Sequence, residues 1–206
     1  DYQYVEEEAP ACTQILTDLI RKGNLKMTSD AAFALYTGLV TDTGRFRFDS
    51  VVSHTFEVAA YLLSFGVSPS VLDNYLSVET LATLKLKGYV LSNFQMTDEG
   101  FAYIKMTRDV VEKYGVSDEE AANQVGTIST IEGCPVWALF MEYPGNEIRI
   151  RLRSRGPVIN TLAEEYNGGG HAKAAGASLD SWDDLDGFVK KASLLVKKYK
   201  EEQNNN

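Results

Sequence analysis

The residues best suited to chemistry in this sequence form a short glycine-rich run that ends in histidine, Gly168-Gly169-Gly170-His171. Three glycines in a row leave the backbone able to adopt positive φ angles, and no Cβ keeps a ligand away. Successive amides in such a turn can point into one concavity and bind an anion. The His171 imidazole can donate hydrogen bonds to phosphate and titrates near neutral pH. The run is therefore a candidate anion site, with a helix C-cap and a tight turn as the plainer interpretation.

Four arginines at alternating positions precede the glycines: Arg149, Arg151, Arg153 and Arg155. The apolar residues between them predict a strand over Glu147 to Ser154, with the first three arginines on one face. Guanidinium groups suit bidentate binding of phosphate, and Ser154 adds a hydroxyl donor. For these arginines taken alone, the alternative to a phosphate site is the ordinary solvent-exposed face of an antiparallel sheet. Because Gly156-Pro157 turns the chain toward Gly168, we expect the strand end, the glycines and His171 to meet around one phosphate.

A single carboxylate, Asp42, stands just past a predicted helix in the turn-like sequence Thr41-Asp42-Thr43-Gly44. A carboxylate in such a place can bind a hard or borderline cation such as Mg²⁺ or Mn²⁺. A turn residue that hydrogen-bonds its own backbone is the plainer interpretation. One carboxylate cannot hold a catalytic metal, and no His/Asp cluster lies nearby in the sequence.

The composition narrows the class of protein. The chain has 206 residues, enough for one large domain or two small ones, and 44% of them are hydrophobic, enough for a core. A net charge of −9 excludes a generally basic nucleic-acid coat, so a local cluster must hold any polyanion. The cysteines, Cys12 and Cys134, follow no metal spacing, and a reducing cytoplasm is the expected location. No apolar run reaches membrane-spanning length, so we expect no membrane partner.

The elements that must position these residues fall into two segments. Helical periodicity dominates the first, and residues 1–80 are predicted to be a helix-rich domain. Near residue 94 the spacing of the apolar residues changes from helical to strand-like, and a mixed α+β segment begins. Residues 81–206 are predicted to be the second domain. A helix over Glu79 to Asn93 is expected to connect the two, with the boundary between Ser77 and Leu84.

Strands and one helix are predicted around the candidate residues of the second segment. Phe94 to Thr97 and Phe101 to Met106 form a hairpin. Val136 to Tyr143 is a strand that pairs with the arginine strand around the turn Pro144-Gly145-Asn146. A helix from Val158 to Tyr166 then leads into the glycine turn.

Two motifs, in this order along the chain, resemble those of the DHH phosphoesterases. Gly38 to Phe46, which contains Asp42, resembles the last metal-binding motif of the catalytic DHH domain. Arg153 to Gly156 and Gly168 to Gly176 resemble the DHH-associated C-terminal domain. The resemblance runs from about Ala9 to Lys198. It is best to the nanoRNase type, bacterial oligoribonucleases that also remove the 3′-phosphate from phosphoadenosine phosphate, with cyclic-di-AMP phosphodiesterases as close relatives.

The resemblance implies an α/β and α+β fold, in which residues 1–80 are the helix-rich end of a parallel-sheet catalytic domain. Residues 81–206 would be a complete mixed-sheet domain that binds substrate. The family implies two Mn ions, with Mg as the alternative, and a metal-activated water that attacks phosphorus. Asp42 matches a metal-ligand position. The substrate-binding positions are matched by Arg153, Ser154, Arg155, Gly168, Gly169, Gly170 and His171. Arg155 matches less well, because that position is often Lys in the family.

The sequence departs from the family in one respect. It contains no Asp-His-His triplet, and Asp1 to Cys12 resembles the segment directly after that triplet in the family. Two metal ions held about 3.5–4 Å apart need several ligands, which Asp42 alone cannot supply. We therefore expect a fragment that keeps the substrate clamp, lacks most catalytic residues and has little or no hydrolase activity by itself.

The expected function of the parent protein is that of a Mn-dependent phosphodiesterase or phosphatase. Its substrates would be very short RNA, dinucleotides such as pApA, or phosphoadenosine phosphate, in the cytoplasm. A non-catalytic module that binds phosphate or nucleic acid is the alternative, because the same C-terminal domain type also occurs in alanyl-tRNA synthetase. The sequence does not choose among these substrates, or between a monomer and a homodimer.

Overall fold

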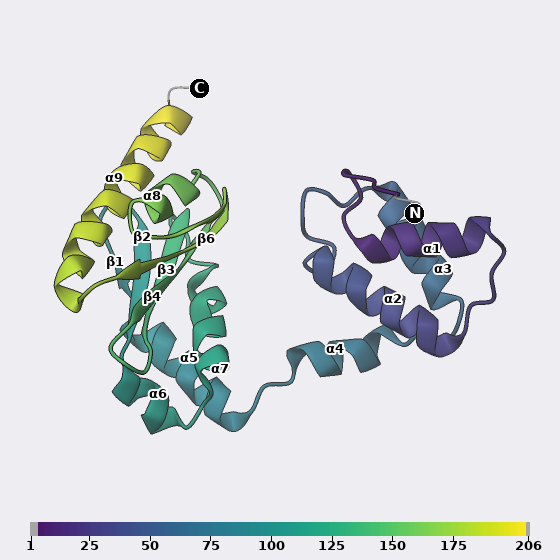
Figure 1. Ribbon diagram of the computed structural model, residues 1–206, viewed down its shortest axis with the longest axis horizontal. Coiled ribbons are helices and arrows are strands. Elements are labelled where there is room, and N and C mark those ends of the chain that lie inside the picture. Colours follow the sequence, from purple (N-terminus) through teal and green to yellow (C-terminus); the bar gives the residue numbers. More distant parts are fainter. Residues whose placement is uncertain (1–3, 205–206) are drawn as a thin grey trace. The chain divides into compact units, whose positions relative to one another are not determined.

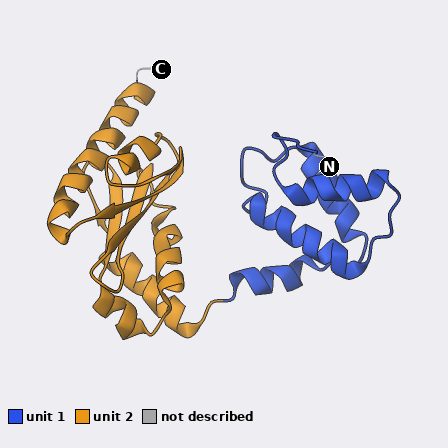
Figure 2. Ribbon diagram, in the orientation of Figure 1, with its two compact units in different colours: residues 1–78 blue, residues 79–206 orange. Residues whose placement is uncertain are grey.

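The computed structural model describes residues 4–204 of the chain. It divides the chain into two compact units, Asp1–Val78 and Glu79–Asn206 (Figure 2). The expected helical connector is wrong, because Val78, Glu79 and Thr80 are not helical. The Thr80 side chain accepts a hydrogen bond from Thr83 N at 3.1 Å and so caps the following helix, which belongs to the second unit.

The first unit is a group of four helices within its described residues. They are α1 (Cys12–Lys22), α2 (Ser29–Asp42), α3 (Ser53–Leu63) and α4 (Pro69–Ser77). Their shared core includes Tyr36 and Leu39 of α2, Leu62 of α3 and Leu72 of α4. Asp42 is the last residue of α2 and not part of the turn after it, since the helix continues until Thr43 Oγ1 donates to Leu39 O at 2.6 Å.

The second unit contains the sheet and the remaining helices. Its helices are α5 (Leu81–Asn93), α6 (Arg108–Tyr114), α7 (Asp118–Asn123), η1 (Gln124–Ile128), α8 (Asn160–Glu164), η2 (Trp182–Asp184) and α9 (Leu185–Asn204). Its strands are β1 (Gln95–Met96), β2 (Phe101–Met106), β3 (Val136–Glu142), β4 (Ile148–Ser154), β5 (Gly169–His171) and β6 (Ala174–Leu179). This mixed α/β arrangement confirms the predicted fold class.

The sheet has the order β1-β2-β3-β4-β6-β5, in which only β2 and β3 run parallel. Helices cover both of its faces, with α9 along one side and α7 on the other (Figure 1). One core lies under α8 and α9 and takes Ile148, Ile150 and Leu152 from β4. The other lies under α5, α6, α7 and η1 and takes Leu139 and Met141 from β3. The arginines of β4 lie on the second face, beside this core.

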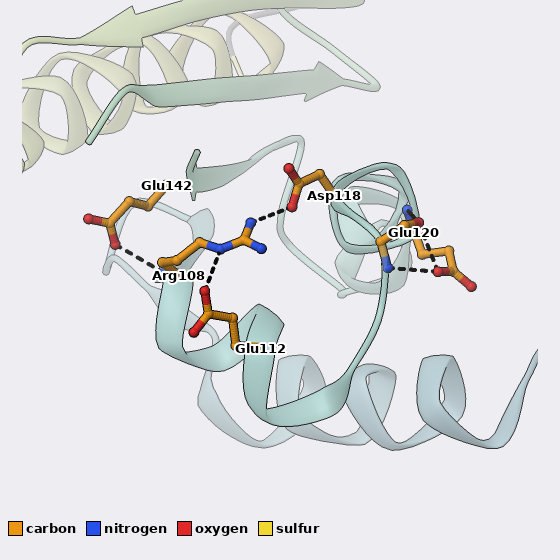
Figure 3. A network of polar contacts seen from close by, with 6 residues as sticks. Arg108, Glu112, Asp118, Glu120 and Glu142 are labelled. Carbon is orange, nitrogen blue, oxygen red and sulfur yellow. Dashed lines mark hydrogen bonds and ion pairs between the residues drawn. The ribbon is translucent and has the colours of Figure 1, made fainter. Parts of the chain in front are cut away.

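A polar network holds the helices of the second face against the end of β3 (Figure 3). The Glu142 carboxylate accepts a hydrogen bond from Arg108 N, the first backbone amide of α6, at 3.0 Å. The Arg108 guanidinium donates to Glu112 one turn later and to Asp118 at the start of α7. A carboxylate at a helix N-terminus satisfies an unpaired amide, so Glu142 ties α6 to the sheet.

Two expectations about the segment before and within the glycines are wrong. The helix predicted from Val158 begins only at Asn160, because Ile159 N donates to Ala172 O instead of to a helical partner. The glycine turn is an edge strand, since Gly169–His171 pairs antiparallel with β6. Gly170 in this strand has a φ of +134°, a conformation that side-chain-bearing residues rarely adopt. Gly169–His171 is therefore part of the sheet and not a loop of successive amides.

Candidate phosphate-binding site

The strand register brings two of the predicted residues into one row across the sheet. Trp137 of β3 pairs with Arg153 of β4, Arg153 pairs with Ala174 of β6, and Ala174 pairs with His171 of β5. Directly paired residues of antiparallel strands share a face, so Arg153 and His171 flank the small Ala174 on one surface. We call these four residues the His171 row.

A second row lies two residues along the strands. Leu139, Arg151, Gly176 and Gly169 occupy it, in the order β3, β4, β6 and β5. We call it the Gly176 row. Gly176 is exposed, and a Cβ on Gly169 would meet nothing within 4 Å. The two rows therefore form a shallow floor of small residues, bordered by arginines from β4 and by His171.

Arg153 is a half-buried cation whose surroundings suit an anion. Burial lowers the pKa of its guanidinium, and the neighbouring charge of Arg151 adds to this. Its hydrogen bond goes to a neutral acceptor, Leu152 O, at 2.9 Å. No carboxylate pairs with it among residues 4–204. Because arginine keeps its charge in proteins, a phosphate at this position would supply the missing counter-charge.

His171 is exposed on the edge strand. Its imidazole has no hydrogen-bond or ion-pair partner within the part of the chain that the structure describes. Both ring nitrogens are therefore available to a ligand. A neutral imidazole offers one donor and a protonated one offers two.

The three glycines of the run have different reasons to be glycine. A Cβ on Gly168 would overlap Gly176 O and would lie 2.6 Å from Ala177 Cα. A Cβ on Gly170 would lie 2.7 Å from Ala174 O. Close backbone approach thus requires glycine at both positions. Only Gly169 combines the absence of a side chain with open space above it, so it is the glycine best placed to touch a ligand.

Ser154 and Arg155 have their hydrogen-bonding groups occupied by the protein itself. Ser154 is buried, and its Oγ donates to Pro157 O at 2.6 Å and accepts from Gly156 N at 3.0 Å. These bonds shape the turn after β4. The Arg155 guanidinium donates to Ile131 O at 3.1 Å and to Cys134 O at 3.2 Å. The register therefore groups Arg153 with Gly169 and His171, whereas the Ser154 hydroxyl and the Arg155 guanidinium bind backbone groups of the protein.

Ala174 and Gly176 belong to the surface, although neither residue type by itself suggests a ligand contact. The sequence feature that indicates their position is the alternation along β6, in which every second residue, including Ala175 and Ala177, points into the core. That alternation places Ala174 and Gly176 on the opposite face. Lys173, in the turn between β5 and β6, anchors the hairpin, because its Nζ donates to Gly156 O and its carbonyl accepts from Ser154 N.

Asp42 does not make a metal centre with the other described residues. Its carboxylate is exposed at the end of α2. No group of three or more His, Cys, Asp or Glu side chains within residues 4–204 could hold a metal ion. A site for two ions requires several such ligands, so the described residues do not fit the complete centre that the resemblance implies.

Cys12 and Cys134 are both free thiols. Cys12 is exposed, and Cys134 is buried with a pKa raised by burial.

None of the helices in residues 4–204 combines the length and apolar character needed to cross a bilayer.

Comparisons with known proteins extend over both units. Residues 98–198 match the model of the DHHA1 domain family. The chain is 37% identical over 202 residues to the bifunctional oligoribonuclease and PAP phosphatase NrnA of Bacillus subtilis, a match that covers 97% of this chain and 64% of that protein. It is 32% identical over 197 residues to a probable protein of the same name from Streptococcus mutans, covering 96% of this chain and 64% of that protein.

A solved structure has the same fold across the chain. The crystal structure of an exopolyphosphatase-related protein from Bacteroides fragilis superimposes with a TM-score of 0.82 at 26% identity. The match covers 97% of this chain and 62% of the other. The chain thus spans less than two thirds of the length of each of these three proteins.

Proposed function

The chain belongs to the DHH phosphoesterase family, and we propose that its second unit binds the terminal phosphate of a short oligoribonucleotide for hydrolysis by the whole protein. The observation that carries this proposal is the His171 row. It presents a half-buried guanidinium without a carboxylate partner among the described residues and an available imidazole on either side of Ala174. Two such donors with a small residue between them suit a phosphate.

The names of the relatives support this substrate class. The proteins from B. subtilis and S. mutans are named oligoribonuclease and PAP phosphatase, and both activities remove a phosphate group or a nucleotide from a short substrate. A dinucleotide such as pApA presents a terminal phosphate at its 5′ end. With two free cysteines and no disulfide among the described residues, a cytoplasmic location is part of the proposal.

We propose further that Asp42 is one ligand of a Mn centre in the whole protein, with Mg as the alternative ion. Its exposed carboxylate has the oxygen donors that such ions accept. Because the described residues supply no further grouped ligands, this 206-residue chain alone should bind Mn²⁺ weakly and hydrolyse little or no substrate. Titration of the chain with Mn²⁺, followed by the spectrum of the ion, checks the binding. Robust Mn-dependent turnover of pApA by the chain alone would contradict this part.

The proposed phosphate contacts of Arg153 and His171, which we call the clamp, are tested by calorimetric titration of pApA into the chain. Arg153→Ala and His171→Ala should each weaken binding by about tenfold to a hundredfold, because a hydrogen bond to a charged group contributes about 1.5–3 kcal/mol. Lys197→Gln is the matched control, since Lys197 is an exposed cation on α9, which packs on the other face of the sheet. The assignment is wrong if both variants bind pApA as tightly as the unsubstituted chain does.

A further inference from the structure

A cavity of about 400 Å³ lies beside the His171 row and includes Arg151 and Gly176 of the Gly176 row. Arg149, Arg151, Gly176 and Ser178 line it from β4 and β6, and Asn167 and Tyr143 border it. The register explains this placement, because Arg149 pairs with Ser178 and Arg151 pairs with Gly176. The volume is within the range of pockets that bind small molecules. None of these residues belongs to the His171 row.

The cavity carries a local positive charge in an acidic protein. Glu147 is the acidic residue of its described lining, and its two carboxylate oxygens accept from Arg149 at 2.8 and 2.9 Å. The same guanidinium lies 4.7 Å from the centre of the Tyr143 ring, so the Arg149 side chain is held in place at the side of the cavity. Arg151 donates only to a neutral group, Asn123 Oδ1, at 3.0 Å within the described residues. Its remaining N–H groups can therefore bind an anion in the cavity.

The spacing of the arginines fits successive phosphates of one chain. Arg151 and Arg153 are two residues apart on the same face of β4, which separates their Cα atoms by about 6.6 Å. A ligand that has one phosphate at the His171 row can therefore extend along β4 toward the cavity. The cavity also has apolar lining, from Met141, Ala122 and the Tyr143 ring, which suits a base or a ribose.

We propose that this cavity binds the second nucleotide of an oligonucleotide whose terminal phosphate lies at the His171 row. Arg151 contacts the phosphate between the two nucleotides, and the second nucleoside lies over Gly176, against Tyr143 and Met141. The inference rests on the proposed function, because the terminal phosphate sets the direction of the chain. It adds a residue, Arg151, that would distinguish an oligonucleotide from a mononucleotide.

The test compares dissociation constants of AMP and pApA for the 206-residue chain and two variants. Arg151→Gln removes the charge, and Gly176→Met fills the cavity without changing the charge. A Cβ on Gly176 meets only Ile150 O, at 3.6 Å, so the backbone accepts a side chain there. Both variants should reduce the preference for pApA over AMP by at least about tenfold. The loss of affinity should be larger for pApA than for AMP in both variants, since AMP has neither a second nucleotide nor a phosphate between two nucleotides.

Salt dependence gives a second readout. In Arg151→Gln the slope of log K against log salt for pApA should fall by about 0.7, the value for one phosphate contact with a single strand. The control Lys197→Gln should leave both the preference and the slope unchanged, because Lys197 lies on α9.

Three outcomes would contradict the second-nucleotide site. A preference for pApA that survives both variants overturns the second-nucleotide site, even where His171→Ala abolishes binding of AMP. Equal losses of AMP and pApA affinity in Arg151→Gln also overturn it, since Arg151 would then hold the terminal phosphate. Binding of AMP that is insensitive to both His171→Ala and Arg153→Ala overturns the proposed clamp itself, and the second site with it.

Discussion

At the scale of residues, the basic side chains of β4 differ in what neutralises them. Arg149 is paired with both oxygens of Glu147, whereas Arg151 and Arg153 donate to neutral acceptors. A paired arginine gains little from a further anion, but an unpaired one that is already partly buried has a desolvation cost that a phosphate offsets. This contrast is why Arg153 and Arg151 are assigned to ligand contacts and Arg149 to the wall of the cavity.

The glycine run offers a matched pair of substitutions. Gly168→Ala should lower the free energy of unfolding by about 1–3 kcal/mol, because its Cβ would overlap the backbone of β6 and force β5 to shift. Gly169→Ala should leave stability within about 0.5 kcal/mol, since its Cβ enters open space. Urea denaturation with an unchanged m-value measures both effects. Equal stability of the two variants would show that β5 does not pack closely on β6.

At the scale of elements, a strand that alternates could be predicted and a strand made of glycine could not. In β4 the pattern of isoleucine and arginine is local, so the sequence alone indicates its length and its two faces. In β5 the residues Gly169 and Gly170 carry no such pattern, and pairing with β6 decides their conformation. The parallel pairing of β2 with β3 likewise has no local signal, because it depends on the long crossover between them.

The same limit applies to the candidate site. Arg153 and His171 were expected to lie together, and the register pairs both with Ala174, because only a short segment containing α8 separates β4 from β5. Arg155 was expected to bind ligand with them, and its guanidinium instead donates to carbonyl groups of the loop before β3 and lies 5.7 Å from the centre of the Trp137 ring. Such partners, distant in sequence, decide where a long side chain points. They cannot be predicted from the spacing of residues along the chain.

A histidine links two helices of the first unit and makes its stability depend on pH. His54 Nε2 lies 2.7 Å from Asp18 Oδ2 of α1, and Nδ1 lies 3.4 Å from Glu57 Oε2 on its own helix, α3. The hydrogen bond to Asp18 raises the pKa of His54 above its usual value, and Glu57 adds to the shift. A raised pKa in the folded state means that the protonated form is stabilised by folding.

The pH dependence therefore has a definite sign. The contribution of His54 is complete below its unfolded pKa of about 6.5 and is lost as the pH rises through the higher folded pKa. Since the His54 side chain is 43% exposed, we expect at most about 1 kcal/mol. Urea denaturation of the chain and of Asp18→Asn across this range measures the effect. The same change of stability with pH in both proteins would mean that the pair contributes nothing.

At the scale of the whole molecule, the two units have separate cores. The core of the first lies between Ala11 and Leu72, and those of the second lie between Leu86 and Val196. A segment with its own hydrophobic core can fold alone. Residues 79–206 should therefore fold when expressed separately and bind AMP within about threefold of the affinity of the full chain, because the His171 row lies entirely in this unit.

Circular dichroism and calorimetric titration of this segment check the expectation, with its His171→Ala variant as the control for specific binding. An unfolded segment would show that the first unit is needed for stability. A folded segment that has lost affinity for AMP by more than about tenfold would show that the first unit contributes to the ligand site.

The topology of the sheet has a kinetic consequence. The arginines, glycines and histidine of the proposed ligand contacts lie on β4, β5 and β6, which all come from residues 148–179 and whose pairings close short loops. The pairing of β2 with β3 must wait for residues 107–135 to form the crossover between them. Since closing a longer loop loses more chain entropy, we expect the parallel pair to form after the pairings of β4, β5 and β6. The strands expected to pair last are then β2 and β3, of which β3 contributes Met141 to the proposed cavity.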